Sequence, residues 1–239
     1  MCSSGPLSTP APPAIPAYLI ETYSWAYLTP RAVQVFERQW LVNLILWGQF
    51  ARLRDAALDA LAPAQGGPVL QVACVYGDFT PRLLQRLHPG ACLTVVDVAP
   101  IQLANLHRKL SRGGEPHSPT VSLLCQDSTS LQLPDASQQA VVLFFLLHEQ
   151  PEAVRRQTLA EAWRVLRPGG QLVVVDYHRP AAWHPSRWLM LPVLRALEPF
   201  AHDLWQHPVA HWLPAVAQPQ RTEHRTWMGG LYQRVVFTR

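Results

Sequence analysis

The 239-residue sequence has few cysteines, no long apolar run and no block of charge of one sign. No apolar run reaches the roughly 18 residues needed to cross a bilayer. The first residues lack a basic segment followed by an apolar one, so we expect no secretory signal. The four cysteines show no C-x-x-C spacing, which argues against a zinc site or a disulfide framework. We therefore expect small core thiols in a reducing compartment, namely Cys2, Cys74, Cys92 and Cys125.

The composition instead fits one folded domain with additions. Hydrophobic residues make up 49% of the chain, enough for one substantial core. The net charge of +4 is modestly basic, but Lys and Arg are scattered. This pattern gives no support to a nucleic-acid partner, and attraction to an anionic membrane surface fits it equally well. Residues 1–16 are rich in Pro, Ser and Ala and are predicted to be a disordered tail.

The central stretch of the chain is Val69–Leu87, where an apolar run breaks at Tyr-Gly-Asp and resumes with helical spacing. Val69–Val75 predicts a strand that is buried on both faces of a parallel sheet. Gly77 can turn sharply, and Thr80-Pro81 supplies an N-cap hydroxyl and a proline for the following helix. In doubly wound α/β proteins, ligands bind at such strand-to-helix turns.

This turn resembles motif I of the class I S-adenosylmethionine (SAM) methyltransferases, in which an acidic residue precedes three spaced glycines. Here Gln71 stands in place of the acid, Ala73 and Val75 replace two glycines, and Tyr76 precedes the one remaining glycine, Gly77. Glycines let the backbone approach a cofactor, so we expect these five positions to hold SAM in an altered way. A degenerate turn that binds nothing is the alternative.

Two further strand ends match positions that bind an adenosine cofactor. The predicted strand Cys92–Val96 ends at Asp97, whose carboxylate would accept hydrogen bonds from the ribose hydroxyls. In the second motif of the same family, the residue at the position of Val98 lies against the adenine. The alternative role for Asp97 is to cap the next helix. Asp127 and Ser128 resemble the position that contacts the adenine amino group.

Strand and helix units continue as far as His178. Ala140–Leu147 is predicted as a buried strand that ends at His148-Glu149, and Pro151–Leu166 as an amphipathic helix. Gln171–Val175 is the strand before Asp176-Tyr177-His178. The segment RVLRPGG before that strand is typical of the same superfamily.

The predicted fold class is α/β, a Rossmann-like class I SAM-methyltransferase fold. Its doubly wound, mostly parallel sheet would end in an antiparallel hairpin formed by Glu223–Met228 and Leu231–Thr238. We divide the chain into a tail (1–16), an N-terminal helical cap (17–62) and a SAM-binding domain (63–239). A helical insertion is expected at about 180–214.

The cap and the insertion are both rich in aromatic residues. Thr29-Pro30 should start a single helix, whose apolar face carries Val33, Phe36, Trp40, Leu44 and Trp47. This helix would pack over the sheet edge or the active-site mouth, or contact a membrane through its tryptophans, and both can be true. In the insertion, one helical face would wall a substrate chamber as a lid, with Leu189, Val193, Leu197 and Phe200.

Four segments together resemble the rhodoquinone-biosynthesis proteins, methyltransferase-like enzymes that convert ubiquinone to rhodoquinone: YSWAYLTPRAVQVFERQWLVNLILWG, VACVYGDFT, LLHEQP and VVVDYHRP. The resemblance implies that SAM donates an amino group, that the ubiquinone ring loses a methoxy group, and that manganese assists. It also implies peripheral contact with a membrane that holds ubiquinone. That membrane would be an inner membrane, reached from its cytoplasmic face, or the mitochondrial inner membrane.

The candidate reactive residues lie at the turn or at the ends of neighbouring strands. The catalytic candidates are Tyr76, His148, Tyr177 and His178, with the two tyrosines expected to stack on the quinone ring. A hard divalent ion prefers carboxylate and imidazole ligands, which gives a pool of His148, Glu149, Asp176 and His178. Two other functions stay open. One is C- or O-methylation of a quinone or another lipophilic aromatic; the other is an inactive methyltransferase-fold subunit that binds lipid or protein.

Overall fold

The computed structural model of the chain describes residues 13–112 and 119–239, so most of the predicted tail lies outside the described part. The strands are β1 (Pro68–Val72), β2 (Cys92–Asp97), β3 (Thr120–Cys125), β4 (Gln138–Phe144), β5 (Leu166–Tyr177), β6 (Arg221–Trp227) and β7 (Tyr232–Thr238). The α-helices are α1 (Ala17–Tyr27), α2 (Pro30–Phe36), α3 (Gln39–Ile45), α4 (Phe50–Ala60), α5 (Phe79–Arg86), α6 (Pro100–Ser111), α7 (Glu152–Val165), α8 (Pro185–Leu197) and α9 (Asp203–Gln206). Short 3-10 turns are η1 (Ala62–Ala64), η2 (Leu147–Glu149), η3 (Val209–Trp212) and η4 (Met228–Gly230).

The strands form one sheet in the order β3-β2-β1-β4-β5-β7-β6. β1 to β5 are parallel, whereas β7 runs antiparallel to both β5 and β6. This confirms the predicted fold class and its C-terminal hairpin. From β1 the chain crosses to β2 on one side and later returns to β4 on the other. The carboxyl ends of these strands therefore flank a switch point in strand order, where ligands bind in such sheets.

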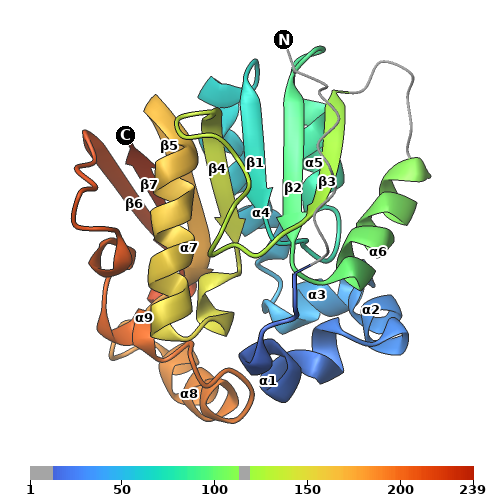
Figure 1. Cartoon of the computed structure of the whole chain (residues 1–239). Coiled ribbons are helices and arrows are strands. Elements are labelled where there is room, and N and C mark those ends of the chain that lie inside the picture. The colour runs from blue at the N-terminus through green and yellow to red at the C-terminus, as the bar shows by residue number, and fades with distance from the viewer. Residues whose placement is uncertain (1–12, 113–118) are drawn as a thin grey trace.

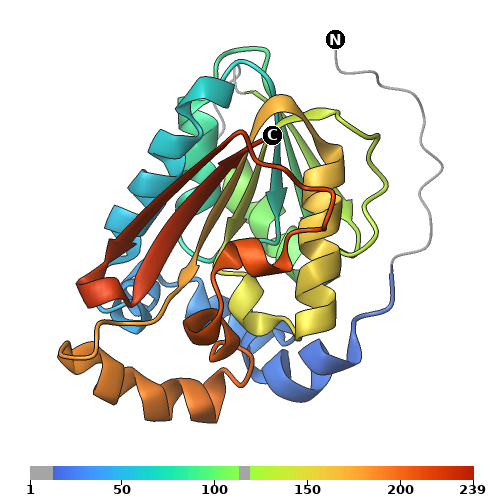
Figure 2. The same cartoon turned by 90° about the vertical axis from the view of Figure 1, so that its left-hand side faces the viewer.

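Helices close the faces of the sheet and one of its ends. α4 and α7 lie on opposite faces, as the two perpendicular views show (Figures 1 and 2). α1, α2, α3 and α8 gather beyond the carboxyl ends of the parallel strands, at the lower end of Figure 1. The two faces thus bury the core, while the cap and the lid meet where the ligand site is expected. Within the described residues, no helix has the length and apolar character needed to span a membrane.

The N-terminal cap is not the single helix that the spacing predicted. Thr29 caps α2 as expected, because its Oγ1 accepts a hydrogen bond from the Ala32 amide at 3.2 Å. The helix then ends at Phe36, and α3 begins at Gln39. At the break, Glu37 pairs with Lys109 and accepts a hydrogen bond from Asn105, both of α6. These tertiary contacts override the local helical pattern.

The lid helix α8 forms as predicted, but with the opposite face buried. Met190 and Leu194 are buried, whereas the predicted stripe of Leu189, Val193 and Leu197 is exposed. Val193 and Leu197 of this stripe nevertheless line the cavity described below, together with Met190 and Leu194. The predicted chamber wall is therefore confirmed for these two residues and not for Leu189 and Phe200.

The cysteines agree with the expectation only in part. Cys74 and Cys125 are free thiols. Cys92 is disulfide-bonded, so the expectation of thiols alone is wrong for this residue. Cys74 lies in the turn after β1, at the edge of the sheet where the candidate site is found.

Candidate active site

A cavity of about 710 Å³ lies beyond the carboxyl ends of β1, β2 and β4. Its wall comes from the turn after β1, from the ends of these strands and from α1, α3 and α8. The lining side chains are mostly apolar or aromatic, and no Lys or Arg is among them. Four carboxylate residues line it, namely Asp97, Asp127, Glu149 and Glu198. The volume is typical of small-molecule pockets, and the wall suits an apolar ligand that also carries a cationic or hydrogen-bond-donating group.

The turn after β1 keeps a glycine-like backbone although its glycines are replaced. Ala73 has a φ of 70° and Gly77 a φ of 79°. A left-handed conformation costs a non-glycine residue about 1–2 kcal/mol, so the surrounding structure must hold Ala73 in place. A Cβ on Gly77 would lie 2.8 Å from Gln39 Oε1, which explains why this glycine remains. Lys109 Nζ fixes the turn by donating to the carbonyl oxygen of Gly77 at 2.7 Å.

Gln71 is fully buried and holds the turn together. Its Nε2 donates to the Ala73 carbonyl at 2.9 Å, and its Oε1 accepts from Thr80 Oγ1 at 3.0 Å. Gln71 and Gly77 are not among the residues that line the cavity, whereas Ala73, Val75 and Tyr76 are. Thr80 was predicted to cap α5, and this is wrong. The helix begins at Phe79, and the Thr80 hydroxyl serves Gln71 instead.

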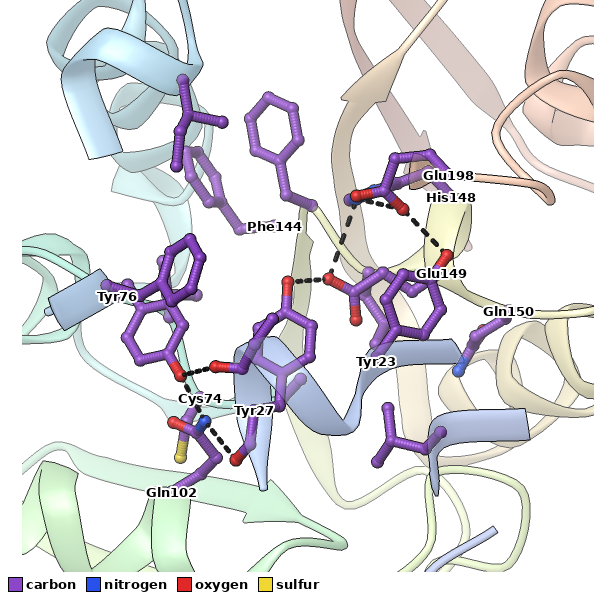
Figure 3. A pocket seen from close by; sticks show the side chains of 18 of the residues that line it. Tyr23, Tyr27, Cys74, Tyr76, Gln102, Phe144, His148, Glu149, Gln150 and Glu198 are labelled. Carbon is purple, nitrogen blue, oxygen red and sulfur yellow. Dashed lines mark hydrogen bonds and ion pairs between the residues drawn. The ribbon is translucent and has the colours of Figure 1, made fainter. Parts of the chain in front are cut away.

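Tyr76 joins the turn to the N-terminal cap. Its ring stacks on Tyr27 and Phe36, with centroids 5.7 and 6.0 Å away. Its hydroxyl donates to the Ala26 carbonyl at 2.8 Å and accepts from Gln102 Nε2 at 2.7 Å (Figure 3). Tyr76 was predicted to stack on the quinone ring, and that contact stays a prediction; the rings on which it stacks in the structure belong to this chain. The bulky side chain anchors α1 and α2 over the cavity.

The residues predicted to hold adenosine share the wall of this cavity. Asp97, Val98, Asp127 and Ser128 all line it. Asp97 accepts hydrogen bonds from the Cys74 amide at 2.7 Å and, two residues along its own chain, from the Ala99 amide at 2.8 Å. The capping alternative for Asp97 is thus present. Each carboxylate oxygen of Asp97 keeps a second lone pair, so Asp97 can cap the loop and still accept hydrogen bonds from a ribose. Burial raises the pKa of Asp97.

His148 is held by Asp176 at the end of β5. His148 Nδ1 lies 2.9 Å from Asp176 Oδ1, and Asp176 also accepts from the amides of Leu147 and Tyr177. The other ring nitrogen, Nε2, lies 3.7 Å from Glu149 Oε1 and 3.9 Å from Glu198 Oε2. Burial lowers the pKa of His148, but the three carboxylates outweigh it and raise that pKa to about 9. A carboxylate behind a histidine fixes the orientation of its ring.

Glu149 and Glu198 approach His148 from different parts of the chain, η2 and the end of α8 (Figure 3). Tyr27 donates its hydroxyl proton to Glu149, and Tyr23 donates to Glu198 Oε2 at 2.8 Å. Burial raises the pKa of Glu149 to about 8, with His148 and Glu198 acting in opposite directions on it. Burial likewise raises the pKa of Glu198. The cluster therefore contains groups that exchange protons near neutral pH.

The predicted metal ligands do not assemble into a metal site. Asp176 is fully buried and already accepts from two amides and from His148. His178 is not part of the cavity wall; its Nδ1 lies 2.8 Å from the Gly230 carbonyl oxygen. Among the described residues, no group of three or more His, Cys, Asp or Glu is arranged to hold a metal ion. The pool of His148, Glu149, Asp176 and His178 is thus a wrong prediction as a ligand set, and we derive no step through manganese.

Arg155 of α7 fixes the loop that carries His148 and Glu149. Its side chain is fully buried and donates to the carbonyl oxygens of Leu147, Gln150 and Phe200, each at 2.9 Å. The guanidinium also lies 4.5 Å from the ring centroid of Trp212. A planar fork of donors suits this set of acceptors, so Arg155 joins η2 to the segment after the lid.

Sequence reasoning missed Tyr23, Tyr27, Gln102 and Glu198. Two signals were present. Tyr23 and Tyr27 are four residues apart, which places them on one face of a helix. Glu198 is an acidic residue at the end of an apolar, aromatic segment, where a carboxylate needs a partner.

The sheet order, the switch point and the cavity define an α/β protein that binds a nucleotide-like co-substrate at the carboxyl edge. A family model described as a methyltransferase domain matches residues 69–170. A ubiquinone/menaquinone biosynthesis C-methyltransferase, UbiE, of Paracoccus denitrificans is 32% identical over 186 residues, covering 74% of this chain and 71% of that protein. The UbiE of Methylobacterium nodulans is 32% identical over 137 residues. That match covers 56% of this chain and about half of the relative, 52%.

A solved structure, the N-methyltransferase NodS from Bradyrhizobium japonicum WM9, has a TM-score of 0.54 with 17% identity. The match covers 77% of this chain and 92% of NodS, and it shows a shared fold. The chain belongs to the class I SAM-dependent methyltransferase family, and SAM is its co-substrate. The cavity fits SAM, because the turn 73–76 and the residues after β2 and β3 line one space. Asp97 and Asp127 both line this space, and their role as acceptors for the adenosine part stays a prediction.

Proposed function

We propose that the protein converts ubiquinone to rhodoquinone at a membrane surface, replacing a ring methoxy group by an amino group donated by SAM. The observation that carries this proposal is where the acidic side chains around the cavity lie. The turn after β1 lines the cavity through residues 73–76 and is held from behind by the neutral Gln71, where the family motif has an acid. Two carboxylates of the wall, Glu149 and Glu198, lie instead beside His148. The site thus lacks its usual carboxylate at the turn and has carboxylates near the aromatic wall.

The aromatic wall beside His148 suits a quinone ring. Tyr177 and Phe145 both line the cavity and meet the His148 ring edge to face, with centroids 5.0 and 6.0 Å away. Bound SAM would supply the group that is transferred. Of this chain's residues, Glu149 can accept or release a proton at its carboxyl, since its pKa of about 8 lies near the working pH. His148, oriented by Asp176, presents Nε2 to the same space.

The cavity opens between α3 and α8 through apolar side chains. Leu44 and Ile45 of α3 and Val193 and Leu197 of α8 both line the cavity and are exposed. Trp47 Nε1 donates to Met190 Sδ at 3.1 Å, which joins the two helices beside this opening. An isoprenoid tail is apolar along its whole length, so an apolar opening lets the tail leave while the ring stays inside.

The same end of the molecule supports a peripheral membrane contact. Exposed tryptophans lie on α3 and just before and within α8, with Trp40 61%, Trp183 80% and Trp188 68% exposed. Tryptophan favours the interface between lipid and water. We expect Trp183→Ser with Trp188→Ser to reduce sedimentation with phospholipid vesicles. Val216→Ser, at an 81% exposed residue outside both helices, is the matched control and should leave it unchanged.

Methylation of a quinone carbon is the second candidate, because both UbiE relatives are C-methyltransferases by name. The deciding experiment incubates the protein with ubiquinone in vesicles and SAM that carries heavy nitrogen in its amino group, with and without manganese. Heavy nitrogen in the quinone ring, measured by mass spectrometry, supports amination. Every ring carbon of ubiquinone is already substituted, so a parallel incubation uses a quinone with a free ring C–H; a methylated, unlabelled product formed there together with S-adenosylhomocysteine would replace the proposal by methyl transfer. No SAM binding in a thermal-shift titration would indicate an inactive subunit.

A further inference from the structure

Among the described residues, the cavity wall carries more acidic groups than basic ones. Four carboxylate residues line it, no Lys or Arg does, and His148 is the one lining histidine. Asp97 and Asp127 bond to nearby groups of the loops that follow β2 and β3. Glu149 and Glu198 are each bonded to a neutral tyrosine hydroxyl, and both share His148 Nε2, at 3.7 and 3.9 Å. Asp176 holds Nδ1 of the same ring, so one histidine faces three carboxylates. Buried negative charge is costly unless a positive group pairs with it, so this part of the wall favours a cationic ligand group.

A second observation comes from Tyr177. This side chain is 5% exposed and lines the same cavity, yet its hydroxyl makes no hydrogen bond among the described residues. Buried polar groups normally have a partner, so an unpaired hydroxyl in a cavity wall indicates a place for a ligand atom. Tyr177 packs against His148, which lies between Glu149 and Glu198.

We propose that Glu149, Glu198 and Tyr177 form a subsite for a protonated amine. An alkylammonium has three N–H donors and one positive charge, and this part of the wall offers two carboxylates and one hydroxyl oxygen as acceptors. The amine is that of the amino-acid end of the co-substrate, and this naming of the amine rests on the proposed function.

The cap and the lid hold this subsite in place. Tyr23 of α1 bonds to Glu198 after α8, and Tyr27, one helical turn further along α1, bonds to Glu149. Both hydroxyls reach the carboxylates from the same helix (Figure 3). Each carboxylate therefore has one fixed partner and retains acceptor capacity for a ligand.

The test measures binding and needs no turnover. Isothermal titration calorimetry compares S-adenosylhomocysteine with its deaminated analogue, which keeps the carboxylate and loses the amine. For Glu198→Gln we expect S-adenosylhomocysteine to bind roughly 10- to 100-fold more weakly, the range of one charge-assisted hydrogen bond. The deaminated analogue should bind equally well to both proteins. Glu21→Gln, at an exposed carboxylate on α1 outside the cavity, is the matched control and should change neither affinity.

An equal loss for both ligands would mean that Glu198 serves the fold alone, and no loss for either would remove the subsite. Thermal melting of each variant checks that it is folded. Glu149→Gln repeats the comparison if Glu198→Gln does not fold. The result of this binding test does not depend on the result of the labelling experiment. A ring without heavy nitrogen refutes amination, whereas a selective loss of amine affinity still supports the subsite.

Discussion

Replacing Arg155 should destabilise the protein strongly and displace the loop that carries His148 and Glu149. Arg155→Met keeps much of the volume of the side chain but removes its donors to the carbonyl oxygens of Leu147, Gln150 and Phe200. It also removes the buried partner of Asp203, which lies 3.3 Å from Nη1. The Asp203 side chain is 41% exposed, so losing this pair costs little. Each buried carbonyl oxygen that loses its donor costs about 1–3 kcal/mol. A substantial fraction of the stability of a domain is therefore expected to be lost.

The matched control is Arg156→Met, one residue along the same helix. Arg156 is exposed and pairs with Glu152, and such surface pairs contribute about 0–1 kcal/mol. Urea unfolding measures the free energy of unfolding of both variants and of Arg155→Lys, which keeps the charge but not the planar fork. We expect Arg155→Met to lose the most stability, Arg155→Lys less and Arg156→Met the least. Equal losses for Arg155→Met and Arg156→Met would refute the argument that Arg155 holds the loop.

Three further outcomes follow from the site. Asp97→Ala should weaken SAM binding by about 1.5–3 kcal/mol, the range for hydrogen bonds to a charged group. If calorimetry finds the affinity for SAM unchanged, Asp97 does not bind the ribose. Gly77→Ala should lower the free energy of unfolding by at least about 1–2 kcal/mol, because φ is 79° and the added Cβ meets Gln39; urea unfolding that matches the wild type would contradict this. Folding raises the pKa of Glu149 from 4.5 to about 8 and that of His148 from 6.5 to about 9, so the native state binds more protons than the unfolded state between about pH 6.5 and 8. The stability should therefore fall as the pH rises through this window, and the fall should be smaller in Glu149→Gln; a variant with the same pH dependence as the wild type would show that Glu149 does not titrate there.

The regular part of the fold was predictable because its signals are local. The apolar run that contains Gln71 marks β1, and Asp97 marks the end of β2. Parallel strands bring such ends to one edge of the sheet. Asp97 and Asp127 therefore line one cavity as predicted. The sequence showed that Gln71 stands where the motif has an acid. It did not show what Gln71 binds, because the bond from Thr80 Oγ1 to Gln71 Oε1 depends on how α5 returns over the turn.

The other part of the site depends on contacts between segments far apart in the chain. Tyr23 and Glu198 are 175 residues apart in the chain, and neither has a motif around it. The prediction that four candidate ligands serve one metal ion failed for a related reason. Asp176 is the second-last residue of β5 and His178 directly follows the strand, but the side chain of Asp176 bonds to η2 amides and that of His178 to the Gly230 carbonyl oxygen. Being at the same strand end did not tell which side chains share a space.

The position of Glu198 and the α1 tyrosines has a consequence for the classification of related enzymes. The family match spans residues 69–170, and Tyr23, Tyr27, Tyr177 and Glu198 all lie outside it. Two proteins can therefore agree throughout that region and differ in every one of these four groups. A tyrosine pair four residues apart before the first strand and a glutamate directly after the lid helix therefore have to be looked for separately, because a match over residues 69–170 does not test them.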